Sequence, residues 1–143
     1  MTVASILTDK GREVVTAGTD TSLSAIVETL SERKIGAIVV TDEDGKVCGI
    51  ISERDVVREI AERGVETLDQ PVSTCMTRKV VSCGENDTIN HVMTLMTRHR
   101  FRHLPVVSGG RLTGIISIGD VVKRRMEQIE RDAEELRNYI ATA

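Results

Sequence analysis

Gly114-Ile115-Ile116-Ser117-Ile118-Gly119-Asp120 is one of two copies of a seven-residue stretch, and Gly49-Ile50-Ile51-Ser52-Glu53-Arg54-Asp55 is the other. Each copy is typical of a short apolar strand that runs through a Ser-x-x-Asp motif into a helix. A hydroxyl and a carboxylate are therefore expected together, twice, at the start of a helix.

The rest of the chain is duplicated in the same way. At an offset of 66 residues, the apolar helical stripe of residues 23–30 matches that of residues 89–96. The offset falls to 65 across the polar turns at residues 42–45 and 108–110, where a hairpin tolerates a deletion. A unit of roughly 65 residues buries only about 60% of its unfolded surface. We therefore expect the two repeats of this 143-residue chain to pack together.

Each repeat is predicted to be α+β (α/β), with the order β-α-β-β-α. The first has strands at 14–16, 37–40 and 47–51, with helices at 23–30 and from 53 to 64. The second has strands at 80–82, 104–107 and 112–117, with helices at 88–97 and from 120 onward. Each unit begins with a short helical segment. The predicted boundaries are residues 3–64 and 71–126.

The last helix continues into a C-terminal extension, residues 127–143. Its apolar residues follow alternating steps of four and three, the spacing of a coiled-coil seam: Val122, Met126, Ile129, Ala133, Leu136 and Ile140. The alternative is that this helix packs back on its own domain. So narrow a stripe buries poorly as a lone surface helix, and we expect it to form a homodimer.

Composition and charge exclude several classes of protein. The net charge of −3 argues against nucleic-acid binding by broad phosphate neutralisation. Apolar runs stay well below 18 residues, so no membrane span is expected. Cys48, Cys75 and Cys83 are odd in number and form no Cys-x-x-Cys pair, which favours a reducing compartment. The N-terminus does not resemble a signal peptide, and we expect a cytoplasmic protein.

Catalysis, metal binding and single-strand binding have weak support. Neither Gly-rich phosphate motif is present, and the cysteines with His91 suggest no triad. His99 and His103 are spaced like a helical metal pair, but Pro105 places His103 in a strand. Residues 98–103 mix cations with an aromatic ring, yet one short cluster on an acidic chain indicates little. We expect no enzyme, no metal and no nucleic-acid partner.

The Ser-x-x-Asp motif has two compatible interpretations. Ser52 or Ser117 can cap its helix while Asp55 or Asp120 reaches back, as in a variant of the capping box. The carboxylate can equally accept two hydrogen bonds from the vicinal hydroxyls of a ribose. The helix N-terminus beside it favours a phosphate.

A second segment of each repeat is predicted to face this motif. Residues 35–37 and 101–103 begin the strands that pair with the Ser-x-x-Asp strands, and their small or flat groups can line a slot for a planar base. Arg102 and His103 can contact a phosphate, as a guanidinium and an imidazolium. The first repeat offers Arg54 as its cation instead.

These motifs occur in the same order and register in both repeats. Together they resemble a tandem pair of cystathionine-β-synthase (CBS) domains. Residues 98–107 with 112–120 are similar to the second repeat of that family, and residues 34–40 with 49–55 to the first. The resemblance spans residues 3–126. It implies a pseudo-twofold Bateman module, a non-catalytic regulatory unit whose clefts bind AMP, ADP, ATP or NAD(H), and sometimes S-adenosylmethionine.

The resemblance also implies partners and site residues. The module would dimerise, need no catalytic cofactor and transmit occupancy to an unknown regulated protein; the alternative is a structural docking pair without ligand. Asp55 and Asp120 would hold the ribose, with Ser52 and Ser117 at the phosphate end. The other predicted ligand-binding residues are Thr16, Ile35, Gly36, Ala37 and Arg54 in the first repeat, and Ser82, Phe101, Arg102, His103, Leu104 and Pro105 in the second. Val39 stands where the second repeat has Pro105, a departure from the family pattern.

Overall fold

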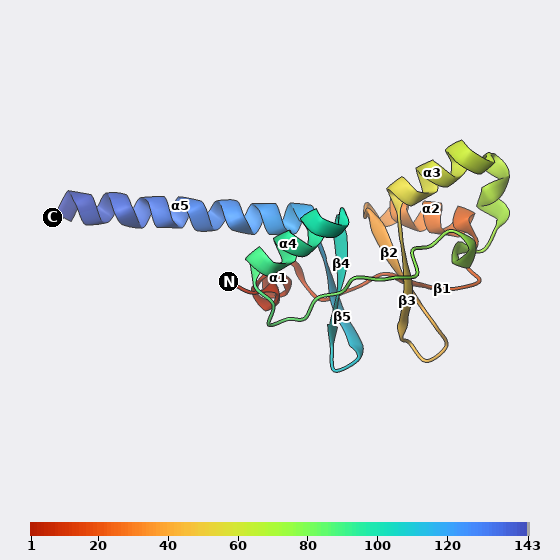
Figure 1. The fold of residues 1–143 in the computed structure, drawn as a ribbon, viewed down its shortest axis with the longest axis horizontal. Helices are drawn as coiled ribbons and strands as arrows, with labels where there is room; N and C mark the ends of the chain where they lie inside the picture. The colour runs from red at the N-terminus through yellow and green to blue at the C-terminus, as the bar shows by residue number, and fades with distance from the viewer. Residues whose placement is uncertain (143) are drawn as a thin grey trace.

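The computed structural model describes residues 1–142, and the predicted mixed fold of two repeats followed by a long C-terminal helix is confirmed (Figure 1). The first repeat comprises α1 (Val3–Lys10), β1 (Thr16–Gly18), α2 (Leu23–Arg33), β2 (Ala37–Thr41), β3 (Val47–Ser52) and α3 (Glu53–Arg63). Two 3-10 turns, η1 (Val65–Asp69) and η2 (Val72–Thr74), lead to α4 (Ile89–His99), β4 (His103–Ser108), β5 (Arg111–Ser117) and α5 (Ile118–Thr142). Ala143, the last residue of the predicted extension, lies outside the described residues.

Two small sheets place the repeated motifs at equivalent positions. The first sheet has the order β1-β2-β3, with β1 parallel and β3 antiparallel to β2, and the second is the β4-β5 hairpin. In the first sheet Ala37 pairs with Ser52, and in the second His103 pairs with Ser117. Each predicted base-lining segment therefore lies across the sheet from a Ser-x-x-Asp serine.

The predicted strand at residues 80–82 does not form. Only an isolated bridge between Cys83 and Val106 remains where the first repeat has strand β1. In the first repeat Val39 donates its backbone N–H to the carbonyl of Val15. Pro105, the counterpart of Val39, has no N–H to donate, so the ladder shortens to a bridge.

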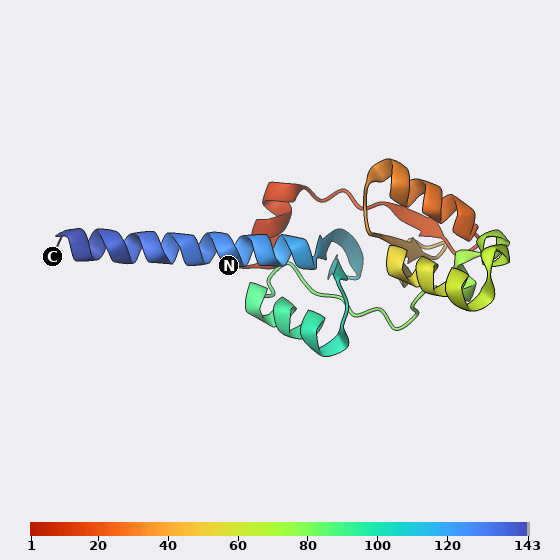
Figure 2. The same ribbon diagram turned by 90° about the horizontal axis from the view of Figure 1, so that it is seen from above.

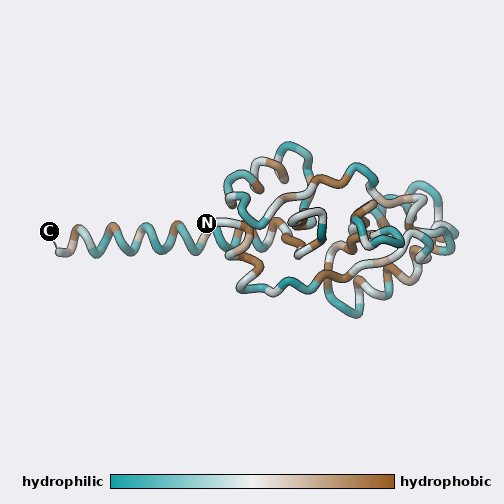
Figure 3. The backbone as a smooth tube through the Cα atoms, turned by 90° about the horizontal axis from the view of Figure 1, so that it is seen from below, coloured by the Kyte–Doolittle hydropathy of each residue, from teal (hydrophilic) through white to brown (hydrophobic). Residues whose placement is uncertain are grey.

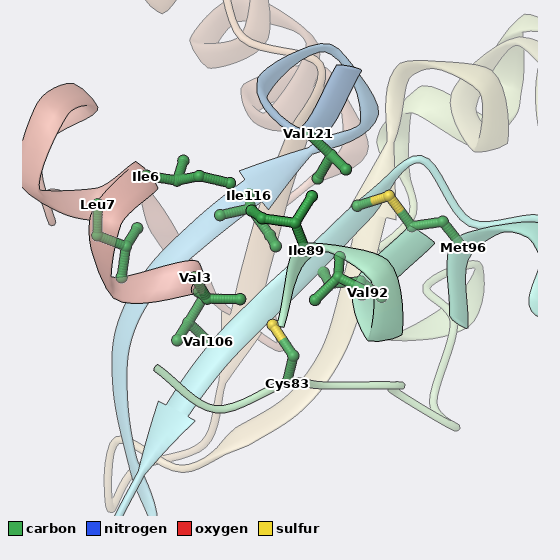
Figure 4. Packing of buried hydrophobic residues seen from close by; sticks show 11 residues of the cluster. Val3, Ile6, Leu7, Cys83, Ile89, Val92, Met96, Val106, Ile116 and Val121 are labelled. Carbon is green, nitrogen blue, oxygen red and sulfur yellow. The ribbon is translucent and has the colours of Figure 1, made fainter. Parts of the chain in front are cut away.

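The hydrophobic cores show that the repeats exchange their leading segments. Val3, Ile6 and Leu7 of α1 are buried against β4, β5 and α4 of the second repeat (Figure 4). Conversely, Val72 and Met76, which lead into the second repeat, are buried in the core of the first. Each core of the pair therefore depends on residues that belong to the other repeat by sequence.

Two glycines make this exchange possible. A Cβ built on Gly114 of β5 would lie 2.7 Å from Leu7 Cδ2, and one built on Gly49 of β3 would collide with the Met76 side chain. Leu7 and Met76 thus occupy the space that a side chain would need at these strand positions. The strand glycines mark close approach of another segment.

Helix α5 leaves the body of the molecule after its first turns. Figure 2 shows α1 and α4 on either side of its start, and Val121 is fully buried there. Beyond that point the helix projects away, and its tube is largely hydrophilic in colour with short hydrophobic bands (Figure 3). The alternative that α5 folds back along its own domain is therefore excluded for the projecting part.

The apolar residues of the projecting stripe are exposed. Val122, Met126, Ile129, Leu136 and Ile140 are 44–66% accessible. Within residues 1–142, no helix has both the length and the apolar character that a membrane crossing requires.

Candidate functional site

Both Ser-x-x-Asp motifs form a reciprocal cap at the start of a helix. Ser52 Oγ accepts a hydrogen bond from Asp55 N at 3.3 Å, while Asp55 Oδ2 accepts one from Ser52 N at 2.9 Å. In the second repeat the corresponding distances are 3.1 Å and 2.8 Å, between Ser117 and Asp120. The capping interpretation of the sequence is confirmed at both sites.

Capping does not hide the carboxylates from solvent. The side chains of Asp55 and Asp120 are 17% and 24% exposed. In both residues the cap uses Oδ2. The Oδ1 atom of Asp55 lies 3.4 Å from the guanidinium of Arg58, which is itself 64% exposed. Part of each carboxylate therefore remains available to a ligand.

The predicted base-lining segments are joined to these helix starts by equivalent backbone hydrogen bonds. The Gly36 carbonyl accepts from Glu53 N at 3.0 Å, and the Arg102 carbonyl accepts from Ile118 N at 2.8 Å. Glu53 and Ile118 are the first residues of α3 and α5. The two halves of each predicted site therefore meet at the junction between a strand and its helix.

His103 lies at the contact between the repeats. A Cβ built on Gly36 would be 3.0 Å from His103 Nε2 and 3.9 Å from a carboxylate oxygen of Glu53. Burial lowers the pKa of His103 below its ordinary value, although the nearby Glu53 carboxylate opposes this shift. This shift favours the neutral imidazole, and the imidazolium contact to a phosphate stays a prediction.

Lys10 is the site residue that the sequence reasoning missed. Its Nζ lies 2.7 Å from Asp120 Oδ2 and donates to the Ile115 carbonyl at 3.0 Å. Partial burial alone would raise the pKa of Asp120, but the hydrogen bonds from Lys10 and Ser117 outweigh it and hold this pKa below its ordinary value. The available signal was the turn at residues 10–12, three residues without a counterpart in the second repeat.

A pocket of about 110 Å³ opens beside this ion pair, between α1 and α5. Its lining side chains are Ile6, Asp9, Lys10, Asp120, Lys123, Arg124 and Glu127. Ligand pockets usually measure about 300 Å³ or more. This pocket therefore accommodates only part of a nucleotide.

Arg124 fixes one wall of the pocket. It donates to the Ser5 carbonyl at 2.6 Å and forms ion pairs with Asp9 and with Glu127. Its side chain is only 14% exposed. Helix α5 is thereby held against α1 at the edge of the pocket.

The remaining predicted residues divide between accessible and buried positions. Phe101 is half-buried and stacks on His99 with ring centroids 6.0 Å apart. Leu104 is fully buried in the core of the second repeat, so its side chain faces away from any ligand. Thr16, Arg54, Ser82 and Arg102 are exposed, Ile35 and Gly36 are half-buried, and Ala37 and Pro105 are buried.

Cys75 and Cys83 are poorly suited to act as nucleophiles. Burial, helped by the Asp87 carboxylate, raises the pKa of the Cys83 thiol to about 12. Burial also raises the pKa of Cys75, and here the Glu59 carboxylate adds to the effect. Both thiols stay protonated at neutral pH, and the thiolate is the reactive form. His91 is exposed on α4, and residues 1–142 contain no group of three His, Cys, Asp or Glu suited to a metal ion.

Comparison with known proteins finds the same architecture. A family model described as "CBS domain" matches residues 3–62 and again residues 72–127. The crystal structure of a CBS-domain containing protein from Agrobacterium tumefaciens is 53% identical, covers 87% of this chain and 92% of its own, and superposes with a TM-score of 0.84.

Two further solved structures contain ligands. The CBS domain pair of protein MJ0100, in complex with 5-methylthioadenosine and S-adenosyl-L-methionine, is 25% identical over 90% of this chain and 98% of its own, with a TM-score of 0.80. A CBS domain protein from Pyrobaculum aerophilum complexed with AMP is 26% identical over 84% of this chain and 89% of its own, with a TM-score of 0.75.

Proposed function

This chain belongs to the CBS domain family, matched in two tandem copies, and from that premise we propose that it is a non-catalytic regulatory module that binds adenosine nucleotides. The main support is the duplicated, partly exposed carboxylate at the start of α3 and of α5, next to a segment suited to a planar base. The AMP and S-adenosyl-L-methionine complexes of similar proteins support an adenosine-type ligand. AMP, ADP, ATP and NAD(H) form the proposed ligand set.

In this proposal Asp55 and Asp120 cap their helices and hold the ribose at the same time. The cap uses Oδ2, which leaves Oδ1 for the sugar hydroxyls. A carboxylate has about four lone-pair sites, so both sets of hydrogen bonds can coexist. The orphan N–H groups and the dipole at the helix start favour a phosphate close by.

The two clefts would differ in their cations. In the second cleft Lys10 is bound to Oδ2 of Asp120, beside the oxygen that the ribose would use, and the phosphate of a nucleotide would offer Lys10 a second partner. Lys123 lines the same pocket and adds positive charge. The first cleft has Arg54 and Arg58 near its carboxylate, both exposed.

Occupancy would be transmitted through the contact between α1 and α5. The pocket beside Asp120 is lined by both helices, and Arg124 joins them. A nucleotide that binds Lys10 would shift this contact, provided that it binds one arrangement better than the other. Self-association through the CBS faces and α5, followed by recognition of a regulated partner protein, completes the proposal. The free cysteines Cys48, Cys75 and Cys83 suit a cytoplasmic location.

Calorimetric titration with AMP, ATP and NADH tests this function on the wild type and on Asp55→Asn and Asp120→Asn. The asparagine keeps an oxygen acceptor for the cap but removes the charge that strengthens hydrogen bonds to ribose. Each substitution should weaken binding at its own cleft by about 2–4 kcal/mol. Asp44→Asn, in the exposed turn between β2 and β3, makes the same change outside both sites and serves as the matched control.

The outcomes separate the competing interpretations. Affinities unchanged in both asparagine variants would remove the ribose role. A wild type that binds none of the three nucleotides would instead favour a structural docking pair without ligand.

A further inference from the structure

Helix α5 presents a continuous apolar seam that nothing in the described chain covers. In heptad positions, Met126, Ala133 and Ile140 are at a, and Val122, Ile129 and Leu136 are at d. Even Val122, where the helix leaves the body, is 44% exposed, and Leu136 near its far end is 60% exposed. The body therefore leaves the whole seam accessible to a partner helix.

We propose that α5 pairs with the α5 of a second copy as a parallel, in-register coiled coil. This inference rests on the self-association proposed above and specifies its geometry. The charges flanking the seam identify the occupant and its direction. In a parallel dimer each g residue faces the e residue five positions later on the partner helix.

The flanking charges suit that arrangement at both positions. Arg125 at g would face the partner copy's Glu130 at e, and Asp132 at g would face the partner copy's Arg137 at e. Both contacts pair opposite charges, and each occurs twice in a symmetric dimer. All four side chains are exposed. Asp132 Oδ1 accepts a hydrogen bond from Gln128 Nε2 at 2.9 Å, which leaves its Oδ2 for the partner copy's Arg137.

An antiparallel dimer with the same overlap has the opposite electrostatics. There g residues face g residues and e residues face e residues. Asp132 would meet Asp132 and Glu130 would meet Glu130, both repulsive; Lys123 would face Arg137, which is repulsive as well. An antiparallel dimer shifted by one heptad would bring opposite charges together, but it would leave part of the apolar seam without a partner.

Charge exchange across the seam tests the pairing, with sedimentation equilibrium of the full chain as the measurement. Arg125→Glu should weaken the dimer about tenfold or more, because it places like charges opposite Glu130. Adding Glu130→Arg should restore the wild-type dimer, since the exchanged charges attract again. Arg131→Glu, the same change at an f position away from the seam, should leave the dimer unchanged.

The double variant distinguishes the directions. In the antiparallel dimer shifted toward the body, residue 125 faces Asp132 and residue 130 faces Lys123, so the exchange would add repulsion rather than remove it. Failure of the double variant to recover would therefore overturn the parallel arrangement. A wild type that stays monomeric up to about 1 mM would overturn pairing altogether.

A cysteine at a seam position provides an independent readout. In the parallel dimer Leu136→Cys meets itself, so mild oxidation should yield an intermolecular disulfide at residue 136, identified by peptide mass. In the antiparallel dimer of full overlap the two sulfurs would be roughly 15 Å apart, beyond reach of a bond. Absence of this disulfide in a dimeric sample would contradict the proposal.

Nucleotide titration of Arg125→Glu keeps this inference separate from the proposed function. A variant that dissociates but binds nucleotide like the wild type supports the pairing without involving the clefts. If none of the seam substitutions changes the dimer, then other faces of the molecule hold it together. That result would refute the α5 pairing and leave the nucleotide proposal intact.

Discussion

Lys10 Nζ contacts Asp120 Oδ2 at 2.7 Å, across 110 residues of sequence. The same ammonium group donates to the Ile115 carbonyl at 3.0 Å. In the first repeat the equivalent carbonyl, that of Ile50, accepts instead from the backbone N–H of Thr77 at 2.9 Å. A side-chain cation thus takes the place of a backbone bridge, and the two Ser-x-x-Asp sites of this pseudosymmetric molecule become chemically different.

Replacing Lys10 by Met should change the preference of the second cleft for phosphate. Adenosine has no phosphate and should bind with little change, whereas AMP loses a cation for its phosphate. We expect the ratio of AMP to adenosine affinity to fall about tenfold in calorimetric titrations. Lys46→Met, in the exposed turn between β2 and β3, is the control. An unchanged ratio would show that Lys10 does not contact the phosphate.

The ion pair also predicts a dependence of stability on pH. Because the folded-state pKa of Asp120 lies below its ordinary value of 3.8, the stabilisation is complete above that pH. It is lost as the pH falls through the lower pKa of the folded protein. The difference in unfolding free energy between wild type and Lys10→Met should therefore be constant from pH 7 to pH 5 and vanish at lower pH. A difference that persists in strong acid would assign the effect of the substitution to packing.

Removing a capping hydroxyl should destabilise the protein without abolishing its fold. Ser52→Ala and Ser117→Ala each leave one helix N–H without its side-chain acceptor. We expect each to lower the free energy of unfolding by about 1 kcal/mol, measured by urea denaturation. Ser31→Ala, on the exposed side of α2, should cost little by comparison. Equal losses in all three variants would mean that the caps contribute nothing specific.

The close approach of the exchanged segments predicts unequal effects of two glycine substitutions. Gly114→Ala collides with Leu7, which is fully buried, and should lower the free energy of unfolding by about 1–3 kcal/mol. Gly49→Ala should cost less, because the unbranched Met76 side chain can adopt another rotamer.

Thermal unfolding measures both substitutions. Gly18→Ala, where the nearest atom to a new Cβ is 4.0 Å away, provides the baseline. If Gly114→Ala unfolds at the same temperature as this control, Leu7 is less tightly held than its buried position indicates.

Sequence alone predicted the features that depend on local pattern. The helices and both capping motifs follow from spacing within a few residues, and the duplication follows from a constant offset between similar stretches. The prediction of a strand at residues 80–82 was wrong because pairing with β4 required a backbone N–H at position 105. That position is distant in sequence and holds a proline, which has no N–H. Strand β1 formed two residues later than predicted, at Thr16–Gly18, where its pairing with β2 sets the boundaries.

The long-range contacts of the site could not be predicted from local sequence pattern. An offset of 65 or 66 residues shows which positions correspond, but not which repeat a leading segment packs on. The three-residue turn after Thr8 was visible as an insertion, yet nothing local indicates that it delivers Lys10 to Asp120. Likewise, nothing local in the sequence indicates that His103 lies against Gly36, and near the Glu53 carboxylate, of the other repeat.

The exchanged segments also separate the unit of sequence duplication from the unit of folding. Suppose that the chain is cut in the connector between Gly64 and Pro71. Each fragment would then lack a segment of its own hydrophobic core and would carry the segment that completes the core of the other fragment. Neither piece should form a stable structure by itself, whereas mixing them should regenerate the native molecule. An ancestor with a single repeat would have met the same requirement by trading segments with a second chain.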